Sequence, residues 1–128
     1  MARILIIDDE EDIRQILATV LRRLGHDVQE AGNGAEGLKL YRQEPADLVI
    51  TDLVMPEKEG LSTIMDLRKI APAARIIAIS GGLAHDPKLY LHMAEKLGAD
   101  RILRKPFQLP ELETAVAETL ALRRSPAG

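Results

Sequence analysis

Residues 4–12 read ILIIDDEED, in which four apolar residues are followed directly by five carboxylates. An uninterrupted apolar run of this kind is typical of a strand that is buried on both faces of a sheet. A block of like charges normally stays solvated, because its members repel one another. Since this block adjoins a predicted core strand, we expect a specific partner to offset the repulsion.

Short apolar runs of the same kind recur along the 128-residue chain and alternate with helical patterns. The predicted strands are Arg3–Ile7, Asp27–Ala31, Asp47–Thr51, Arg75–Ile79 and Arg101–Leu103. The clearest helical pattern places apolar residues at positions 13, 16, 17, 20, 21 and 24, and Gly25 follows as its C-terminal cap. Weaker helical spacing predicts further helices around residues 35–41, 61–67, 89–97 and 112–120.

This alternation predicts an α/β fold with a five-stranded parallel sheet and five helices that cover both faces. The first and third strands are apolar throughout and suit central positions, whereas the second and fifth carry polar residues that suit the edges. The doubly wound, flavodoxin-like strand order 2-1-3-4-5 satisfies both preferences. We expect a single domain over residues 1–124 and a flexible tail over residues 125–128.

The composition argues against several classes of function. With a net charge of −3 and three aromatic residues, the chain offers neither a basic stripe nor a stacking surface, so direct nucleic-acid binding is not expected. No apolar run reaches the roughly 18 residues that a membrane span needs, so no membrane association is expected. The absence of cysteine is typical of a reducing compartment, and we expect a cytoplasmic protein.

Polar residues follow the predicted strands at the points where the strands end. In a parallel sheet these ends share one edge, which is where doubly wound folds place their functional sites. Asp8 and Asp9 follow the first strand, and the corresponding residues after the third, fourth and fifth strands are Asp52, Ser80 and Lys105. Three carboxylates, a hydroxyl and an ammonium group are therefore expected to converge.

Carboxylates gathered at one edge of a sheet favour a bound cation. Like charges about 4 Å apart repel by several kcal/mol near a protein surface, and a divalent ion removes that repulsion. Because the chain has no cysteine and no suitably spaced histidine pair, these oxygen ligands predict Mg²⁺ rather than Zn²⁺. Glu10, Glu11 and Asp12 are assigned instead to the start of the first helix, where negative side chains complement the helix dipole.

Four segments, IIDDEE, DLVITDLVMPEKEG, IIAISGG and LGADRILRKPF, resemble in order and spacing the receiver domain of two-component response regulators. The resemblance spans residues 2 to about 122. It implies a phosphoacceptor module in which Asp52 takes a phosphoryl group from a histidine kinase or phosphotransfer protein in a Mg²⁺-dependent reaction. The resulting conformational change would control a downstream protein or an output domain, and a homodimer formed on phosphorylation is left open.

The same resemblance implies a role for each residue of the edge. Asp9 would bind Mg²⁺ directly, Asp8 largely through water, and Val54 through its main-chain carbonyl, and the acceptor Asp52 would also belong to the metal site. Ser80 and Lys105 would bind oxygens of the phosphoryl group, and Pro106 would follow a cis peptide that directs Lys105 inward. Beyond its own phosphoryl transfer and dephosphorylation, the domain is not expected to be an enzyme.

The predicted switch consists of Ser80, Gly81, Gly82, Ile102 and Pro106. Phosphorylation would draw Ser80 inward and reorder the loop that begins at the two glycines. Family members usually carry Tyr or Phe where this chain has Ile102, so the usual aromatic readout is not expected here. The segment GGLAHDPKLY also makes the stretch between Ser80 and Lys105 longer than is typical of the family.

Three rival functions remain to be weighed against the receiver domain. A phosphatase of the haloacid-dehalogenase type also uses an Asp nucleophile, Mg²⁺, Ser or Thr, and Lys, but it carries an Asp-x-Asp motif, whereas Asp8 and Asp9 are adjacent. A flavin carrier would need a phosphate-binding loop after the first strand, which an acidic segment opposes. A pseudo-receiver that only docks partners would not need the complete acidic set together with Lys105.

Overall fold

The structure is a computed structural model that describes residues 2–53, 59–81, 96 and 98–122. The described strands are β1 (Arg3–Ile7), β2 (Asp27–Ala31), β3 (Leu48–Asp52), β4 (Ile76–Gly81) and β5 (Arg101–Lys105). The described helices are α1 (Glu11–Arg23), α2 (Gly34–Gln43), α3 (Glu59–Ile70) and α5 (Leu109–Leu120). The predicted helix around residues 89–97 falls almost entirely outside the described residues, as does the tail over residues 125–128.

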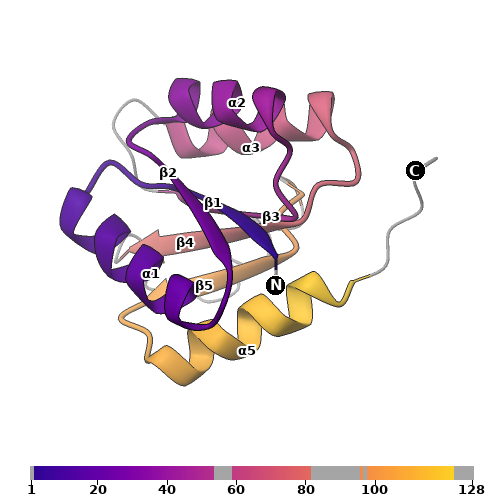
Figure 1. The fold of residues 1–128 in the computed structure, drawn as a ribbon. Coiled ribbons are helices and arrows are strands. Elements are labelled where there is room, and N and C mark those ends of the chain that lie inside the picture. The colour runs from indigo at the N-terminus through magenta and orange to yellow at the C-terminus, as the bar shows by residue number, and fades with distance from the viewer. Residues whose placement is uncertain (1, 54–58, 82–95, 97, 123–128) are drawn as a thin grey trace.

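All five strands form one parallel sheet in the order β2-β1-β3-β4-β5. The predicted order 2-1-3-4-5 is therefore confirmed, with the two polar strands at the edges. In Figure 1 the sheet runs through the middle of the molecule, with α1 and α5 on one face and α2 and α3 on the other. This arrangement is the doubly wound, flavodoxin-like architecture that the alternating pattern predicts.

Alternate residues of each central strand contribute to two separate hydrophobic layers. Ile4 and Ile6 of β1 lie in the layer beneath α1 and α5, whereas Leu5 and Ile7 lie in the layer beneath α2 and α3. All four are at most 1% exposed. Because burying one such side chain contributes about 1.5–3 kcal/mol, β1 is held firmly from both faces. The first acidic residue of the site follows directly from this strand.

Helix α1 buries a narrower face than its apolar spacing predicts. Leu17, Ala18 and Leu21 are buried, but Ile16 is 61% exposed and Leu24 is 45% exposed. The buried strip is centred on residues 17–21, and Leu24 comes after Arg23, the last residue of the helix. Ile16 and Leu24 flank that strip and remain at the surface.

Three strands extend further toward the site than the sequence predicts. β3 includes Asp52, β4 continues to Gly81 and β5 continues to Lys105. The polar residues at these ends stay in the sheet because ladder pairing continues there, with Asp52 opposite Ile79 and Gly81 opposite Lys105. Backbone pairing, rather than side-chain polarity, therefore sets the strand ends.

Helix α2 approaches the sheet closely at Gly37. A Cβ atom added to Gly37 would lie 2.4 Å from Cδ1 of Ile7, so no larger residue fits without movement. Asn33 caps the helix, because its side chain accepts a hydrogen bond of 2.8 Å from the backbone N–H of Glu36. The close approach at Gly37 packs α2 against Ile7 of β1, the strand that leads into the acidic segment, and the Asn33 cap fixes where the helix begins.

Candidate functional site

The site lies at the carboxyl ends of the parallel strands and is built around two buried carboxylates. Asp52 is the last residue of β3 and Asp8 follows β1, and each is 1% exposed. Ser80 of β4 is also 1% exposed, while Lys105 at the end of β5 is half-buried. The structure thus places four of the five residues predicted for this edge at neighbouring strand ends.

Lys105 forms the central ion pair of the site. Its Nζ lies 3.2 Å from Oδ2 of Asp52, which makes this a hydrogen-bonded salt bridge to a buried carboxylate. The same Nζ lies 3.9 Å from Oε1 of Glu10. The peptide bond between Lys105 and Pro106 is cis, as the resemblance implied. A surface hollow is lined by Ile13, Lys105, Pro106 and Phe107.

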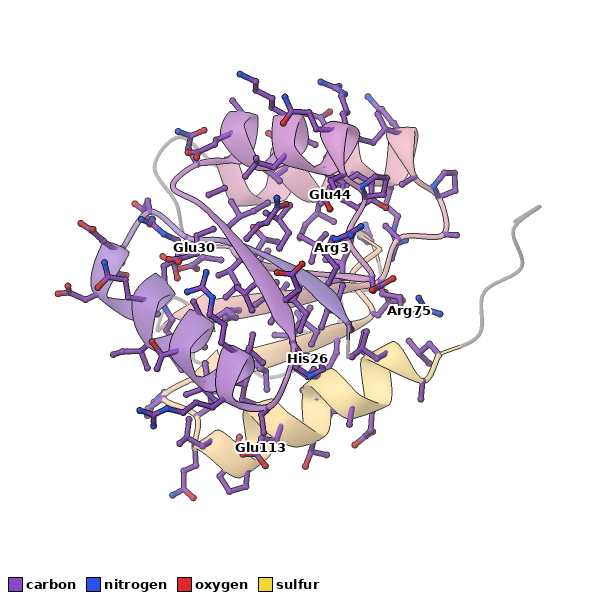
Figure 2. The ribbon with its side chains drawn as sticks, in the orientation of Figure 1. Arg3, His26, Glu30, Glu44, Arg75 and Glu113 are labelled. Carbon is purple, nitrogen blue, oxygen red and sulfur yellow. The ribbon has the colours of Figure 1, made fainter. Side chains whose placement is uncertain are left out.

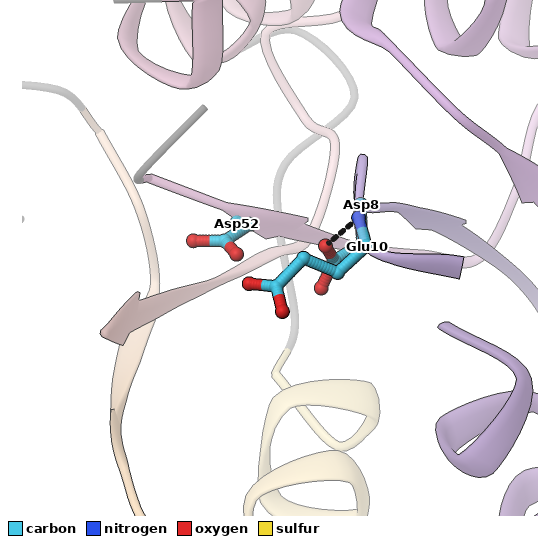
Figure 3. Close-up of side chains that lie close together, drawn as sticks. All are labelled: Asp8, Glu10 and Asp52. Carbon is cyan, nitrogen blue, oxygen red and sulfur yellow. Dashed lines mark hydrogen bonds between the residues drawn. The ribbon is translucent and has the colours of Figure 1, made fainter. Parts of the chain in front are cut away.

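Three carboxylates come together beside Lys105. One oxygen each of Asp8, Glu10 and Asp52 lies within 4.8 Å of the other two (Figure 3). Oδ1 of Asp8 accepts a hydrogen bond of 2.9 Å from the backbone N–H of Glu10. Its other oxygen, Oδ2, is buried and has no hydrogen-bond partner among the residues that the structure describes. A buried acceptor of this kind is costly unless a hydrogen-bond donor, a proton or a cation meets it.

Burial raises the pKa of Asp8 above its ordinary value of 3.8. The backbone N–H of Glu10 opposes this increase, whereas the negative charge of Asp52 adds to it. The positive charge of Lys105 offsets only part of the repulsion. The site therefore carries more negative charge than its own cation balances, which is the condition under which a hard divalent ion binds.

The donor atoms of this site fit Mg²⁺. Its carboxylates supply only oxygen ligands, and Mg²⁺ prefers one or two carboxylates together with water. Oδ2 of Asp8 has no partner within the described ranges, and the repulsion from Asp52 that helps to raise its pKa would be removed by a cation at this position. Among the described residues, Asp8, Glu10 and Asp52 form the group of carboxylates that could hold such an ion.

Glu10 was assigned to the helix start by the sequence alone, yet its carboxylate reaches the site. It occupies the N-cap position of α1 and makes no capping hydrogen bond with its side chain. Short side chains such as Ser, Thr, Asn and Asp are the preferred caps, so a Glu at this position is free to extend elsewhere. That mismatch is the signal by which the sequence could have indicated Glu10.

The other residues predicted for the site do not contribute to the group of close carboxylates. Asp9 is exposed and does not belong to the group of close carboxylates, so its role as a direct ligand stays a prediction. Ser80 has a buried Oγ without a partner among the described residues. Ile102 is partly buried against the layer of α2 and α3. Val54 and Gly82 lie outside the described residues.

A search of the helices that the structure describes found none long and apolar enough to cross a membrane.

Comparisons with known proteins point in one direction. The family model described as "Response regulator receiver domain" matches residues 4–117. The chain is 39% identical over 126 residues to the DNA-binding transcriptional regulator NtrC of Azospirillum brasilense, covering 98% of this chain and 26% of that protein. It is 31% identical to the chemotaxis protein CheY of Halobacterium salinarum, covering 92% of this chain and 96% of that protein.

Solved structures give the same result. A response regulator receiver domain protein from Clostridium thermocellum superposes with a TM-score of 0.83 at 33% identity, covering 94% of both chains. The chain spans about a quarter of the NtrC relative and 48% of the probable transcriptional regulator ycf27 of Porphyridium aerugineum, to which it is 37% identical over 92% of its own length.

Proposed function

The chain belongs to the response regulator receiver domain family, and we propose that Asp52 is the residue through which it accepts a phosphoryl group. As a receiver domain it is a phosphoacceptor module of two-component signal transduction. The observation that carries the assignment is the buried carboxylate of Asp52, paired with Lys105 at 3.2 Å. Beside it lies a second buried carboxylate, one oxygen of which has no partner among the described residues.

In the proposed reaction, an oxygen of Asp52 attacks the phosphorus atom of a phosphohistidine donor. A new P–O bond forms, the P–N bond of the donor breaks, and its electron pair leaves with the imidazole nitrogen, which holds or gains a proton. Asp52 is suited to this step because its side chain is held at a strand end and faces the other charged groups. Positioning of this kind supplies much of the catalysis in phosphoryl transfer.

Lys105 and Ser80 would receive the oxygens of the phosphoryl group. The ammonium of Lys105 already lies against Asp52, so it would neutralise negative charge on the transferred group without a large movement. The buried hydroxyl of Ser80 lacks a partner among the described residues and would donate a hydrogen bond to one phosphoryl oxygen. That hydrogen bond would link phosphorylation to the segment that follows β4.

Mg²⁺, held by Asp8, Asp9, Asp52 and the main-chain carbonyl of Val54, would supply positive charge that lowers the repulsion between the carboxylate and the phosphoryl group. Glu10 is a further carboxylate within reach of this position. Oδ2 of Asp8, which has no partner in the described part of the chain, supports the assignment, because a cation close to it would offset the cost of its burial.

We propose a histidine kinase or a phosphotransfer protein as the donor and a downstream protein or output domain as the recipient of the signal. Receiver domains are regulatory modules, and we expect only self-phosphorylation and dephosphorylation as chemistry. The folded unit would span residues 1–124 with a short tail behind it, and the absence of cysteine supports a cytoplasmic location. The family match does not favour the phosphatase, and the intact acidic set does not favour a pseudo-receiver.

Intact-protein mass spectrometry tests the assignment. The chain is incubated with Mg²⁺ and a small phosphodonor such as phosphoramidate, and one phosphoryl group should be added. Asp52→Asn should abolish stable addition, whereas the matched variant Asp27→Asn, at the opposite end of the sheet, should be modified like the wild type. A stable adduct on the Asp52→Asn protein would overturn the assignment of the acceptor.

A further inference from the structure

The acidic turn, defined here as residues 8–10, is held by an arginine that lies outside the group of carboxylates. Arg14 of α1 donates a hydrogen bond of 2.7 Å from Nη1 to the main-chain carbonyl of Asp8. Its side chain is only 17% exposed. A charged donor at this distance to a partly buried carbonyl makes one of the stronger kinds of hydrogen bond in proteins.

Glu30 of β2 holds Arg14 from the other side. Nε of Arg14 lies 3.4 Å from Oε1 of Glu30, whose own side chain is 26% exposed. Figure 2 labels Glu30 near the carboxyl end of β2, on the side of α1. Arg22, further along the same helix, lies 3.4 Å from Oε2 of Glu30 and donates a hydrogen bond of 3.0 Å to the carbonyl of Val28. Both arginines therefore tie α1 to the edge strand, but only Arg14 reaches the acidic turn.

Arg14 completes the support of the Asp8 main chain. The N–H group of Asp8 donates to the carbonyl of Ala31 at 3.1 Å, and the carbonyl of Asp8 accepts from Arg14. With both backbone groups bound, the side chain stays directed at Asp52 even though burial and like charge oppose it. Without the arginine, rotation of the peptide after Asp8 would move the next carboxylates as well.

We propose that Arg14 is a positioning residue that raises the affinity of the site for Mg²⁺ by fixing the carbonyl of Asp8, and that Glu30 orients Arg14 for this task. The proposal rests on the proposed function, because it assumes that the acidic turn binds the ion. Some residues do not touch the metal but hold its ligands in place by hydrogen bonds. Removing such a residue typically lowers metal affinity by about 10–100-fold. Arg14 suits this role because its charged, largely buried guanidinium donates directly to the carbonyl of Asp8.

Titration calorimetry with MgCl₂ on the purified chain tests the proposal without any phosphodonor. Arg14→Met keeps much of the aliphatic bulk and removes the donor, and it should weaken Mg²⁺ binding about tenfold. Arg22→Met is the matched control, since Arg22 shares the helix and the partner Glu30 but does not contact Asp8. Its Mg²⁺ affinity should stay within about twofold of the wild type, because it does not touch the acidic turn.

Two further variants separate positioning from general stability. Glu30→Gln should weaken Mg²⁺ binding in the same direction as Arg14→Met but by less, and Arg14→Lys should restore part of the loss because one charged donor remains. Thermal unfolding without Mg²⁺ is measured for every variant. The proposal requires the largest loss of Mg²⁺ affinity in the variant that loses the hydrogen bond to Asp8. Variants with similar losses of unfolding temperature but an intact hydrogen bond should keep more of their Mg²⁺ affinity.

Equal Mg²⁺ affinity for folded Arg14→Met and wild type would overturn the proposal, as would equal losses for the Arg14 and Arg22 variants. If Arg14→Met does not fold, unchanged affinity in both Arg14→Lys and Glu30→Gln overturns it, and a graded loss supports it. Failure of the proposed function looks different, because the wild type itself would then neither bind Mg²⁺ nor take up a phosphoryl group.

Discussion

The ammonium group of Lys105 lies 3.2 Å from the buried carboxylate of Asp52, although 53 residues separate them in the chain. Removing the ammonium would leave Asp52 facing two other carboxylates without this cation. We expect Lys105→Ala to slow phosphorylation and to uncouple it from the conformational change. Mass spectrometry measures the first effect, and ¹⁵N–¹H NMR spectra with and without phosphodonor measure the second.

Lys69→Ala is the matched control for Lys105→Ala, because Lys69 is exposed in the last turn of α3. This variant should give spectral changes on phosphorylation like those of the wild type. Full spectral changes in the Lys105→Ala protein would show that the signal does not pass through the ammonium group.

Asp8→Asn should stabilise the metal-free protein at neutral pH. Burial raises the pKa of Asp8 in the folded state, so the folded state holds the proton more tightly than the unfolded chain. The free energy of unfolding therefore falls as pH rises from 3.8 through the folded-state pKa, and the ionised carboxylate reduces stability above that window. Removing it should add about 1 kcal/mol at pH 7.

Thermal unfolding with EDTA between pH 4.5 and 7.5 checks this prediction. The advantage of Asp8→Asn should be largest at neutral pH and should shrink as pH approaches the ordinary value of 3.8. A variant that is less stable than the wild type at pH 7 without metal would contradict the argument from burial.

Removal of Mg²⁺ should lower the unfolding temperature of the wild type more than that of Asp9→Ala. A ligand present at about 100 times its dissociation constant adds about 2.7 kcal/mol to the free energy of unfolding. Asp9→Ala should lose most of that gain if Asp9 binds the ion directly. Asp12→Ala, which changes an exposed carboxylate in the first turn of α1, is the matched control and should keep the gain.

Glu10→Gln is measured beside Asp9→Ala in the same thermal-unfolding experiment, with and without Mg²⁺. The Glu10 carboxylate lies within 4.8 Å of Asp8 and Asp52, whereas Asp9 is not in that group. We expect the larger loss of Mg²⁺ stabilisation in Asp9→Ala and a smaller loss in Glu10→Gln. The reverse order would mean that the longer side chain supplies the ligand in this protein.

Gly37→Ala should destabilise the fold although alanine is the better helix former. The new Cβ would lie 2.4 Å from Cδ1 of Ile7, and overpacking of this kind typically costs about 1–3 kcal/mol. Chemical denaturation measures the change, with the exposed Lys39→Ala on the same helix expected to stay within about 0.5 kcal/mol. A Gly37→Ala protein that is more stable than the wild type would show that helix and sheet separate easily.

The sequence predicted the architecture because its main determinants are local. Apolar strands and polar edge strands follow directly from the order of residues, and both were confirmed by the sheet order. The convergence of Asp8, Asp52 and Lys105 also followed, since parallel strand ends must share an edge. A family resemblance added the cis peptide before Pro106, which residue patterns alone do not predict.

Features that depend on side-chain reach could not be predicted in the same way. Spacing grouped Ile16 with the other apolar residues of α1, but which of these residues are buried depends on how the helix lies against the sheet. Glu10 was assigned to the dipole of α1, whereas its length lets it reach Lys105. The contact between Arg14 and Asp8 depends on how α1 lies beside β2, which no local pattern fixes.

Residues of β1 alternate between two hydrophobic layers, so the number of residues in the strand determines where Asp8 lies. Successive residues of the strand face opposite sides, so deleting one residue from Ile4–Ile7 would exchange the occupants of the two layers in the part of the strand that shifts. The same deletion would draw the acidic turn back along the sheet by about 3.3 Å, away from Asp52 and Lys105. Relatives that keep this site should therefore vary in the residues they place in β1 and not in its length.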